Sequence, residues 1–397
     1  MQPIPGYLRE RYKDKNKGNF GLFLNKFIHL DDKYKVPIQA YNQFKDTFKQ
    51  MSSYISGFLT NRQFEQSNVC ESFIRAGYEK IVITARLSSP LIVGLGESHP
   101  SETGIFLDHN MGIPYIPASS IKGVVRLAHT IGLLKDDQGM WLQETAMKSL
   151  YDFDPKKQDL MLENDKTNIP AMFGRSEKKE SSKGGIIFLD AYPADVPRLK
   201  VDIMNPHYSE YYSGKKDRGP TDDQMPVPIK FLVVDKGAEF VFRALVKTDK
   251  TSQRADLAAL CRKALRNAVT EEGIGAKTAL GYGRFDIVKW EEPDFIRAKM
   301  DEERRESKEL AEKKRLDVMS EEERLVEEIH HLGGDSQAIS GLVKRCFAST
   351  SDAAVFRVLR ERLQELGQWK PSGSKQRKQG MKERNDKIEQ FIAGRND

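Results

Sequence analysis

The middle of the chain alternates between apolar patterns typical of strands and of helices. Every second position from 81 to 87 is apolar, which predicts a strand over 80–87 with one buried face. Residues 119–134 instead carry apolar side chains at helical spacing, so we expect an amphipathic helix there. Further strands are expected at 185–190, 228–234, 239–247 and 282–289, and a second helix at 252–271.

The order of these elements is β-α-β, an insertion, and then β-α-β. This order is typical of the ferredoxin-like (RRM-like, βαββαβ) arrangement. Many unrelated proteins share that fold, so the order alone assigns no function. The Pro-, Asp- and Tyr-rich segment 191–227 is expected to form an inserted hairpin or loop region. We therefore predict an α+β core over 80–289.

The segments on either side of this core have different patterns. Residues 1–79 are rich in aromatics with roughly helical spacing over 41–59, which predicts a partly helical N-terminal extension. After the core, 24 of the 40 residues from 291 to 330 are charged, as is typical of a solvated helix.

The C-terminal region has the pattern of several short amphipathic helices. Ser320 and Glu323 have the spacing of a capping box, and two further apolar stripes follow before Gly367. We predict a charged α-helical module over 290–369. Residues 370–397 are expected to form a flexible, basic tail.

Charge and composition narrow the class of protein. The 397 residues include 64 Lys and Arg against 58 Asp and Glu, a formal charge of +6. Residues 1–289 carry a net +7 and the remainder a net −1, so the basic excess lies in the first part. No apolar run could span a membrane, and no secretory signal is visible. Three widely spaced cysteines argue against a disulfide framework, so we expect a cytoplasmic protein without membrane partners.

The helix that begins at Ser119 and Ser120 is the first candidate site. Free backbone N–H groups and the positive end of the helix dipole suit a phosphate. Lys122, Arg126 and His129 lie at i, i+4 and i+7, so they are expected to share one polar face. Such a basic line could follow a nucleic-acid backbone. An ordinary capped helix with a solvated face gives the same pattern.

The glycine loop, residues 273–284, is the second candidate site. Its glycines allow the backbone to approach a ligand closely. Lys277, Thr278 and Arg284 supply donors, and Tyr282 offers a face for base stacking. The pattern matches neither of the common nucleotide-binding glycine motifs. A tight helix-to-strand turn is the alternative, although it needs fewer glycines. The four glycines are Gly273, Gly275, Gly281 and Gly283.

Histidines are the weakest candidates for chemistry. A general base would have to come from His99, His109, His129 or His207. Their spacing matches no known metal motif, and we expect no metal or cofactor. Tyrosines and lysines around His207 suit stacking on unpaired bases, but a packed tyrosine cluster explains them equally well.

Several motifs, in their order along the chain, resemble a known family. They are GLGESHPSETG, GIPYIPASSIKGVVR, MFGRSE with GGIIFLDAYP, NPHYSEYY, PVPIKFLVV and GIGAKTALGYGRF. Together they resemble RAMP-superfamily proteins of type III CRISPR–Cas systems, most closely the Cmr-type sixth subunits of type III-B effector complexes. The resemblance covers about residues 90–290. The SSIK helix motif paired with the late glycine motif is its most specific part.

The resemblance implies an RNA-binding, non-catalytic structural subunit of an antiviral ribonucleoprotein. In this family the corresponding residues face the guide RNA backbone near its 3′ end, which would apply to Lys122, Arg126, Lys277 and the loop glycines. The implied partners are guide RNA, target RNA and other RAMP subunits. Ala118 replaces a glycine that is usual in the family, so the turn before the helix could differ.

The sequence is also compatible with two other functions, and it leaves the role of one region unassigned. Related RAMP proteins are metal-independent endoribonucleases that act on guide precursors or target RNA, so cleavage is the main alternative. A generic RNA-recognition module has less support, because no RNP-type aromatic motif is present. The helical module after 290 lies outside the family core; we expect it to contact another protein or to be a passive appendage.

Overall fold

A computed structural model describes residues 18–394 except 27–30, 32–35, 38–39, 98, 100, 102, 136–138, 142–150, 155–158, 163–167, 177–180, 206–207, 209–210, 212–213, 215–225, 227, 249–255 and 372. The chain divides into two compact units, Met1–Met300 and Asp301–Asp397. The division therefore falls within helix α11 (Asp294–Val318) and not at residue 290.

The first unit is built around one antiparallel sheet. Its strands run in the order β11-β1-β10-β6, and β7 also pairs with β10. Ile83 on β1 lies opposite Phe242 on β10, and Ala85 lies opposite Ile287 on β11. The predicted strands at 80–87, 185–190, 239–247 and 282–289 all contribute to it. Its strands are β1 (Tyr78–Leu87), β6 (Ile186–Phe188), β7 (Tyr192–Pro193), β10 (Glu239–Lys247) and β11 (Phe285–Lys289).

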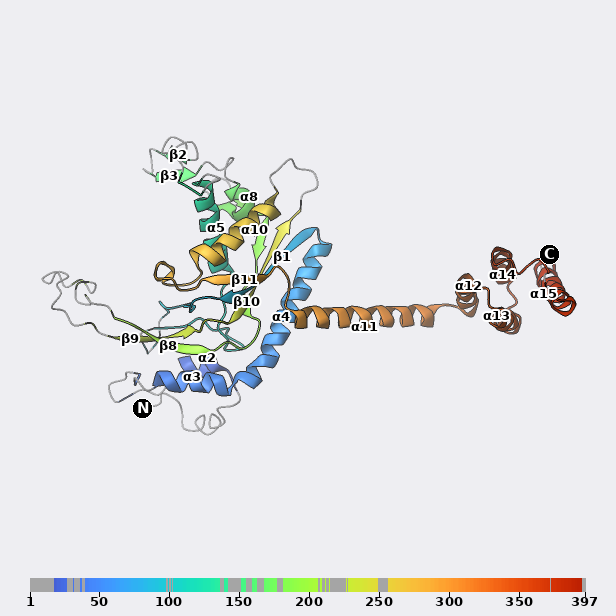
Figure 1. Cartoon of the computed structure of the whole chain (residues 1–397), viewed down its shortest axis with the longest axis horizontal. Coiled ribbons are helices and arrows are strands. Elements are labelled where there is room, and N and C mark those ends of the chain that lie inside the picture. The colour runs from blue at the N-terminus through green and yellow to red at the C-terminus, as the bar shows by residue number, and fades with distance from the viewer. Residues whose placement is uncertain are drawn as a thin grey trace. The chain divides into compact units, whose positions relative to one another are not determined.

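Two helices pack side by side against this sheet. Helix α5 (Ala118–Leu133) lies between β1 and β6 in the sequence, and α10 (Leu257–Asn267) lies between β10 and β11. They contact each other (Figure 1). The stripe of Ile121, Val125 and Ala128 is buried in the main core, as its helical spacing predicts.

The N-terminal helices belong to the same core. Helix α4 (Ser52–Arg75) packs against β1, and it is preceded by α2 (Phe20–Asn25) and α3 (Ala40–Gln50). Phe20 and Phe48 are fully buried with ring centroids 4.9 Å apart. The partly helical character of this region is confirmed, but it is not a separate extension, because its aromatic side chains complete the hydrophobic core.

The strand expected at 228–234 is present but does not join the main sheet. It is β9 (Ile229–Val234), which pairs with β8 (Leu199–Met204) in a separate two-stranded sheet. Strand β8 lies inside the predicted insertion, and β9 directly follows it. Apolar periodicity identifies a strand but not its neighbour, which is why the sequence could not reveal this pairing. The remaining small elements are β2 (Tyr151–Asp154), β3 (Asp159–Leu162), α8 (Ile169–Phe173), β4 (Gly174–Ser176) and β5 (Ser181–Lys183).

The second unit is helical, as predicted. After α11 come α12 (Glu321–His331), α13 (Ser336–Ser349), α14 (Ala353–Glu365) and α15 (Lys375–Ala393). The capping box is present: Glu323 N donates to Ser320 Oγ at 3.1 Å, and Ser320 N donates to Glu323 Oε2 at 2.9 Å.

The prediction of a flexible tail after 370 is wrong for α15. Ile388 and Ile392 belong to the hydrophobic core that the helices of this unit share, and Met381 is also buried. Asn385 Nδ2 also donates to Trp369 O at 2.6 Å. The apolar positions recur at helical spacing, but many charged residues separate them and obscure the pattern in the sequence.

No described helix is long and apolar enough to cross a bilayer. The three cysteines, Cys70, Cys261 and Cys346, are buried and free.

Candidate functional site

The N-terminus of α5 is partly occupied by a side chain of the protein. Ala118 N donates to the Asp190 carboxylate at 2.7 Å, while Ser120 N and Ile121 N both donate to Pro117 O. The sequence predicted that the N–H groups at this helix end would be free to bind an anion. That prediction is wrong for Ala118, because Asp190 already supplies a negative group at the positive end of the helix. The sequence signal was an acidic residue directly after the 185–189 apolar run.

The polar face of α5 carries two exposed cations. Lys122 and Arg126 are exposed, and neither pairs with a carboxylate in the described part of the chain. His129 does not join them: it is buried, and its ring lies 6.3 Å from that of Phe173. Helix α8 packs against α5 and covers this end of the predicted line. Ser119 is exposed and Ser120 is half-buried.

The geometry of the protein itself explains the glycines of the glycine loop. All four glycines, Gly273, Gly275, Gly281 and Gly283, have positive φ values, from +71° to +104°. A Cβ atom at Gly275 would lie 2.2 Å from Ile92 O, and one at Gly283 would lie 1.9 Å from Ile274 O. The chain packs too closely for any side chain at those two positions. The number of glycines therefore does not by itself indicate a ligand.

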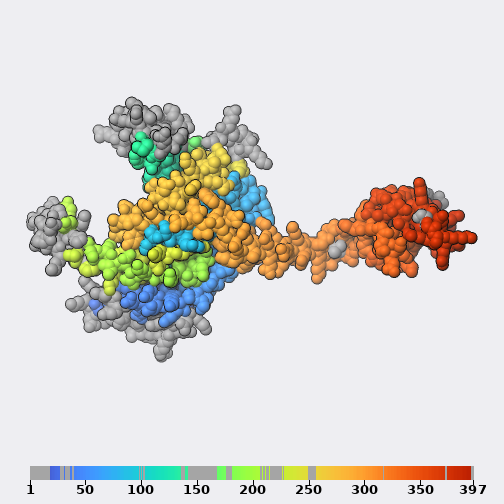
Figure 2. All heavy atoms as spheres, viewed as in Figure 1, coloured from blue at the N-terminus to red at the C-terminus, as the bar shows by residue number. Residues whose placement is uncertain are grey.

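The glycine loop is hydrogen-bonded to the segment that follows β1. Gly283 N donates to Pro90 O at 2.8 Å, and Ala276 N donates to Ile92 O at 2.8 Å. Arg284 N donates to Ser89 Oγ at 3.0 Å. In Figure 2 the cyan surface of the segment after β1 is flanked by yellow-green and orange surfaces. The loop is thus held by backbone contacts that fix its orientation.

The side chains of the glycine loop have different environments. Lys277 is half-buried and Arg284 is exposed, and neither pairs with a carboxylate among the described residues. Thr278 is half-buried. Leu280 is 72% exposed at the tip. The sequence pattern does not mark it as a surface residue, because an apolar residue in a glycine-rich segment resembles a core residue.

Tyr282 is less available for stacking than its sequence context suggested. Its hydroxyl donates to Asp202 Oδ2 on β8 at 3.0 Å, and its ring packs against the cluster of Ile92, Phe231 and Val233. Burial and the hydrogen bond to Asp202 raise the pKa of Tyr282. At least part of the ring is therefore used to hold the loop against the β8–β9 hairpin.

The two candidate motifs adjoin each other in the fold. Helix α5 packs against the π-helical turn Ala268–Glu272. That turn ends at Gly273, whose N–H donates to Ala268 O at 3.0 Å. The turn that α5 contacts therefore leads directly into the glycine loop, in which the cations Lys277 and Arg284 follow.

The histidines do not converge on a common site. His99 Nδ1 accepts from Ser101 N at 3.1 Å, and its Nε2 donates to Leu24 O at 3.0 Å. Burial lowers the pKa of His99. His109 is exposed in a turn whose backbone is held by Asn19. His207 lies outside the described residues. In the same described part, no group of three or more His, Cys, Asp or Glu side chains could hold a metal ion.

The core of the chain matches a known protein family. The model of the RAMP superfamily matches residues 84–286. The chain is 31% identical over 299 residues to CRISPR system Cmr subunit Cmr6 of Pyrococcus furiosus, covering 66% of this chain and 78% of that relative. It is 27% identical over 192 residues to the Cmr6 subunit of Saccharolobus solfataricus, covering 48% of this chain and half of that relative.

Two solved structures are also similar. One is a cryo-EM structure of the type III-B Cmr-beta complex bound to cognate target RNA; the chain in it is 22% identical, with a TM-score of 0.42 and coverage of 66% of this chain and 78% of that one. The other is a crystal structure of Cmr6 from Pyrococcus furiosus, 30% identical, with a TM-score of 0.32 and coverage of 54% and 99%. The family match and the sequence identity confirm the resemblance seen in the motifs: the chain belongs to the RAMP superfamily and is similar to the Cmr6 subunits of CRISPR systems.

Proposed function

We propose that the chain is a non-catalytic, RNA-binding subunit of a type III (Cmr-like) CRISPR interference ribonucleoprotein in the cytoplasm. It would contact the guide RNA backbone near the 3′ end and assemble with other RAMP subunits, which together target foreign RNA. The observation that carries this proposal is the contact between α5 and the turn that leads into the glycine loop. That turn leads directly into the glycine loop, which carries Lys277 and Arg284.

The state of the cations supports phosphate binding. Lys122, Arg126, Lys277 and Arg284 have no carboxylate partner among the described residues, whereas Arg86 of the same unit pairs with Glu239 at 2.7 Å. Unpaired cations on adjoining elements attract a polyanion without reading its sequence. Sequence selection would then come from guide–target base pairing.

We further propose that the core is ferredoxin-like. The first, second, third and fourth strands of that fold would be β1, β6, β10 and β11. The order β11-β1-β10-β6 and the antiparallel pairing support this assignment. So do the positions of α5 and α10 between successive strands of the two halves.

The endoribonuclease alternative has less support. A general base needs a nitrogen free to accept the proton of the 2′-OH. In His99 one ring nitrogen accepts from a backbone N–H and the other donates to a carbonyl, and His129 is buried. Cleavage by the isolated chain that is lost in His109→Ala or His207→Ala would favour the alternative.

The salt dependence of RNA binding tests the RNA-binding function. Each of Lys122→Ala and Arg126→Ala should weaken binding of single-stranded RNA irrespective of its sequence. Each should also reduce the slope of log K against log salt concentration by about 0.7, as expected when one phosphate contact is lost. Lys308→Ala, an exposed change on α11, is the control and should leave the slope unchanged. An unchanged slope in all three variants would remove α5 from the RNA path.

A further inference from the structure

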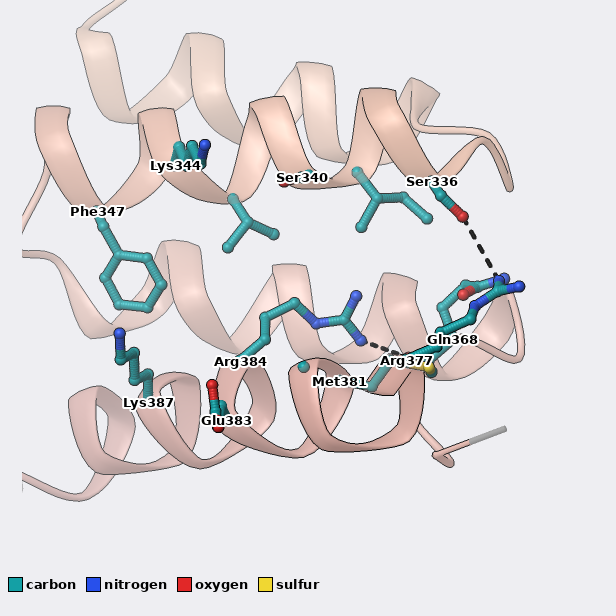
Figure 3. Close-up of a pocket in the computed structure, with 13 residues that line it drawn as sticks. Ser336, Ser340, Lys344, Phe347, Gln368, Arg377, Met381, Glu383, Arg384 and Lys387 are labelled. Carbon is teal, nitrogen blue, oxygen red and sulfur yellow. Dashed lines mark hydrogen bonds between the residues drawn. The ribbon is translucent and has the colours of Figure 1, made fainter. Parts of the chain in front are cut away.

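The helical unit contains a cationic groove between two of its helices. It is a cavity of about 440 Å³ between α13 and α15 (Figure 3). In Figure 3 the Arg384 side chain points from α15 toward the space between the helices. The lining residues of the groove come from both helices and, through Gln368, from the segment that follows α14.

The floor of the groove is apolar, and its lining carries four cations against one carboxylate, Glu383. Ile339, Val343 and Met381 are buried beneath it. Lys344 on α13 and Lys387 on α15 are exposed at its edges. A surface with this combination suits an amphipathic ligand that carries apolar and negatively charged groups close together.

The cations of the groove have no charged partners. None of Lys344, Arg377, Arg384 and Lys387 pairs with a carboxylate in the described part of the chain. Arg377 contacts the Ser336 hydroxyl at 3.5 Å, and Arg384 donates to Gln368 O and Asn385 Oδ1.

Other arginines of the unit are paired. Arg345 pairs with Glu328, and Arg360 Nη1 lies 3.5 Å from Glu389 Oε2. Burial lowers the pKa of Arg384, which reflects a cation removed from water without a counter-charge. A negatively charged ligand would supply that charge.

The charge of the unit is also unevenly distributed. Residues 336–393 contain 12 Lys and Arg against 6 Asp and Glu, whereas residues 294–331 contain 9 against 13. The balanced total for the C-terminal region therefore hides a basic portion that holds the groove. Electrostatic complementarity favours an acidic partner for that portion.

Gly380 keeps part of the groove open. It lies in the interior of α15, where glycine is less favourable than alanine. A Cβ atom there would meet no atom within 4 Å. A larger side chain at this position would therefore extend into the groove without straining the helix.

We propose that this groove binds an acidic amphipathic segment of a partner protein, with apolar side chains on the floor and carboxylates against the basic rim. RNA is the less favoured occupant, because a phosphate backbone offers no apolar groups that would pack against the floor of Ile339, Val343 and Met381. The proposal is independent of the RNA-binding function of the first unit.

A defined peptide tests the proposal with the full-length chain. The probe is a fluorescent 14-residue helical peptide with leucines at i, i+3, i+7 and i+10 and glutamates at most other positions, measured by anisotropy. We expect saturable binding. The double variant Lys344→Glu/Lys387→Glu should weaken it at least tenfold, and Gly380→Leu should do the same by filling the groove. A peptide with glutamine in place of glutamate should also bind at least tenfold more weakly.

Matched controls separate the groove from general charge and folding effects. Lys378→Glu/Lys382→Glu reverses two exposed charges of α15 that do not line the groove, and Gly341→Leu adds a leucine to α13 outside it. Both should bind the peptide as the original chain does. Failure of the peptide to bind, or equal losses in the controls, would overturn the proposal. A dodecauridine oligonucleotide that loses affinity only in the groove variants would also overturn it, by assigning the groove to RNA.

Discussion

Arg243 and Glu292 form a buried ion pair that joins three elements of the first unit. Arg243 Nη2 lies 2.6 Å from Glu292 Oε2, and its Nε lies 3.0 Å from Oε1. Ser67 Oγ on α4 donates to the same carboxylate at 2.6 Å, and Arg243 Nη1 donates to Gln66 Oε1 at 2.8 Å. Burial alone would raise the pKa of Glu292, but Arg243 and these hydrogen bonds bring it below its usual value. The pair therefore fixes α4 and the segment after β11 against the sheet.

Removing the arginine should be strongly destabilising. Arg243→Met would leave Glu292 buried without a counter-charge, and we expect a loss of about 3–5 kcal/mol in the free energy of unfolding of the first unit. Hydrogen exchange of the β10 amides under increasing denaturant would measure it. Arg86→Met is the control, because its partner Glu239 is more exposed, and it should cost at most about 1 kcal/mol. Equal costs for the two variants would contradict the role assigned to the buried pair.

Two glycines of the glycine loop should respond differently to alanine. Both Gly281 and Gly283 have positive φ, but only Gly283 also faces a backbone atom at close range. Gly281→Ala should cost about 1 kcal/mol from backbone strain alone. Gly283→Ala should cost about 1–3 kcal/mol more, because its Cβ would overlap Ile274 O. Unfolding measurements on the two variants compare them directly, and similar values would show that close packing does not explain Gly283.

His99 should make the stability of the first unit sensitive to mild acid. Burial lowers the pKa of His99 from its ordinary 6.5, so below that pH the unfolded chain binds a proton that the folded chain resists. Stability should therefore decrease as the pH falls below about 6.5 and level off above it. In His99→Gln this dependence between pH 5 and 7 should be reduced, while RNA affinity at pH 7.5 stays unchanged. An identical pH profile for the two proteins would rule out this contribution.

The sequence was informative where a feature is local and less so where it depends on tertiary contacts. The stripe of α5 and the capping box at Ser320 depend on neighbours within one helical turn, and both were predicted. The partner of β9, the burial of His129 and the contact of Asp190 with Ala118 depend on distant segments. Local sequence also cannot show what pairs with Arg243, because its partner Glu292 lies 49 residues further along the chain.

Photo-cross-linking in the assembled ribonucleoprotein tests the central claim most directly. A photoreactive amino acid would replace Lys122, Lys277 or, as the control, Lys308, in particles that contain labelled guide RNA. The α5 and glycine-loop surface predicts cross-links from positions 122 and 277 to the 3′ part of the guide, and background labelling from position 308. Labelling at 122 and 277 no stronger than at 308 would contradict the assignment of this surface to RNA.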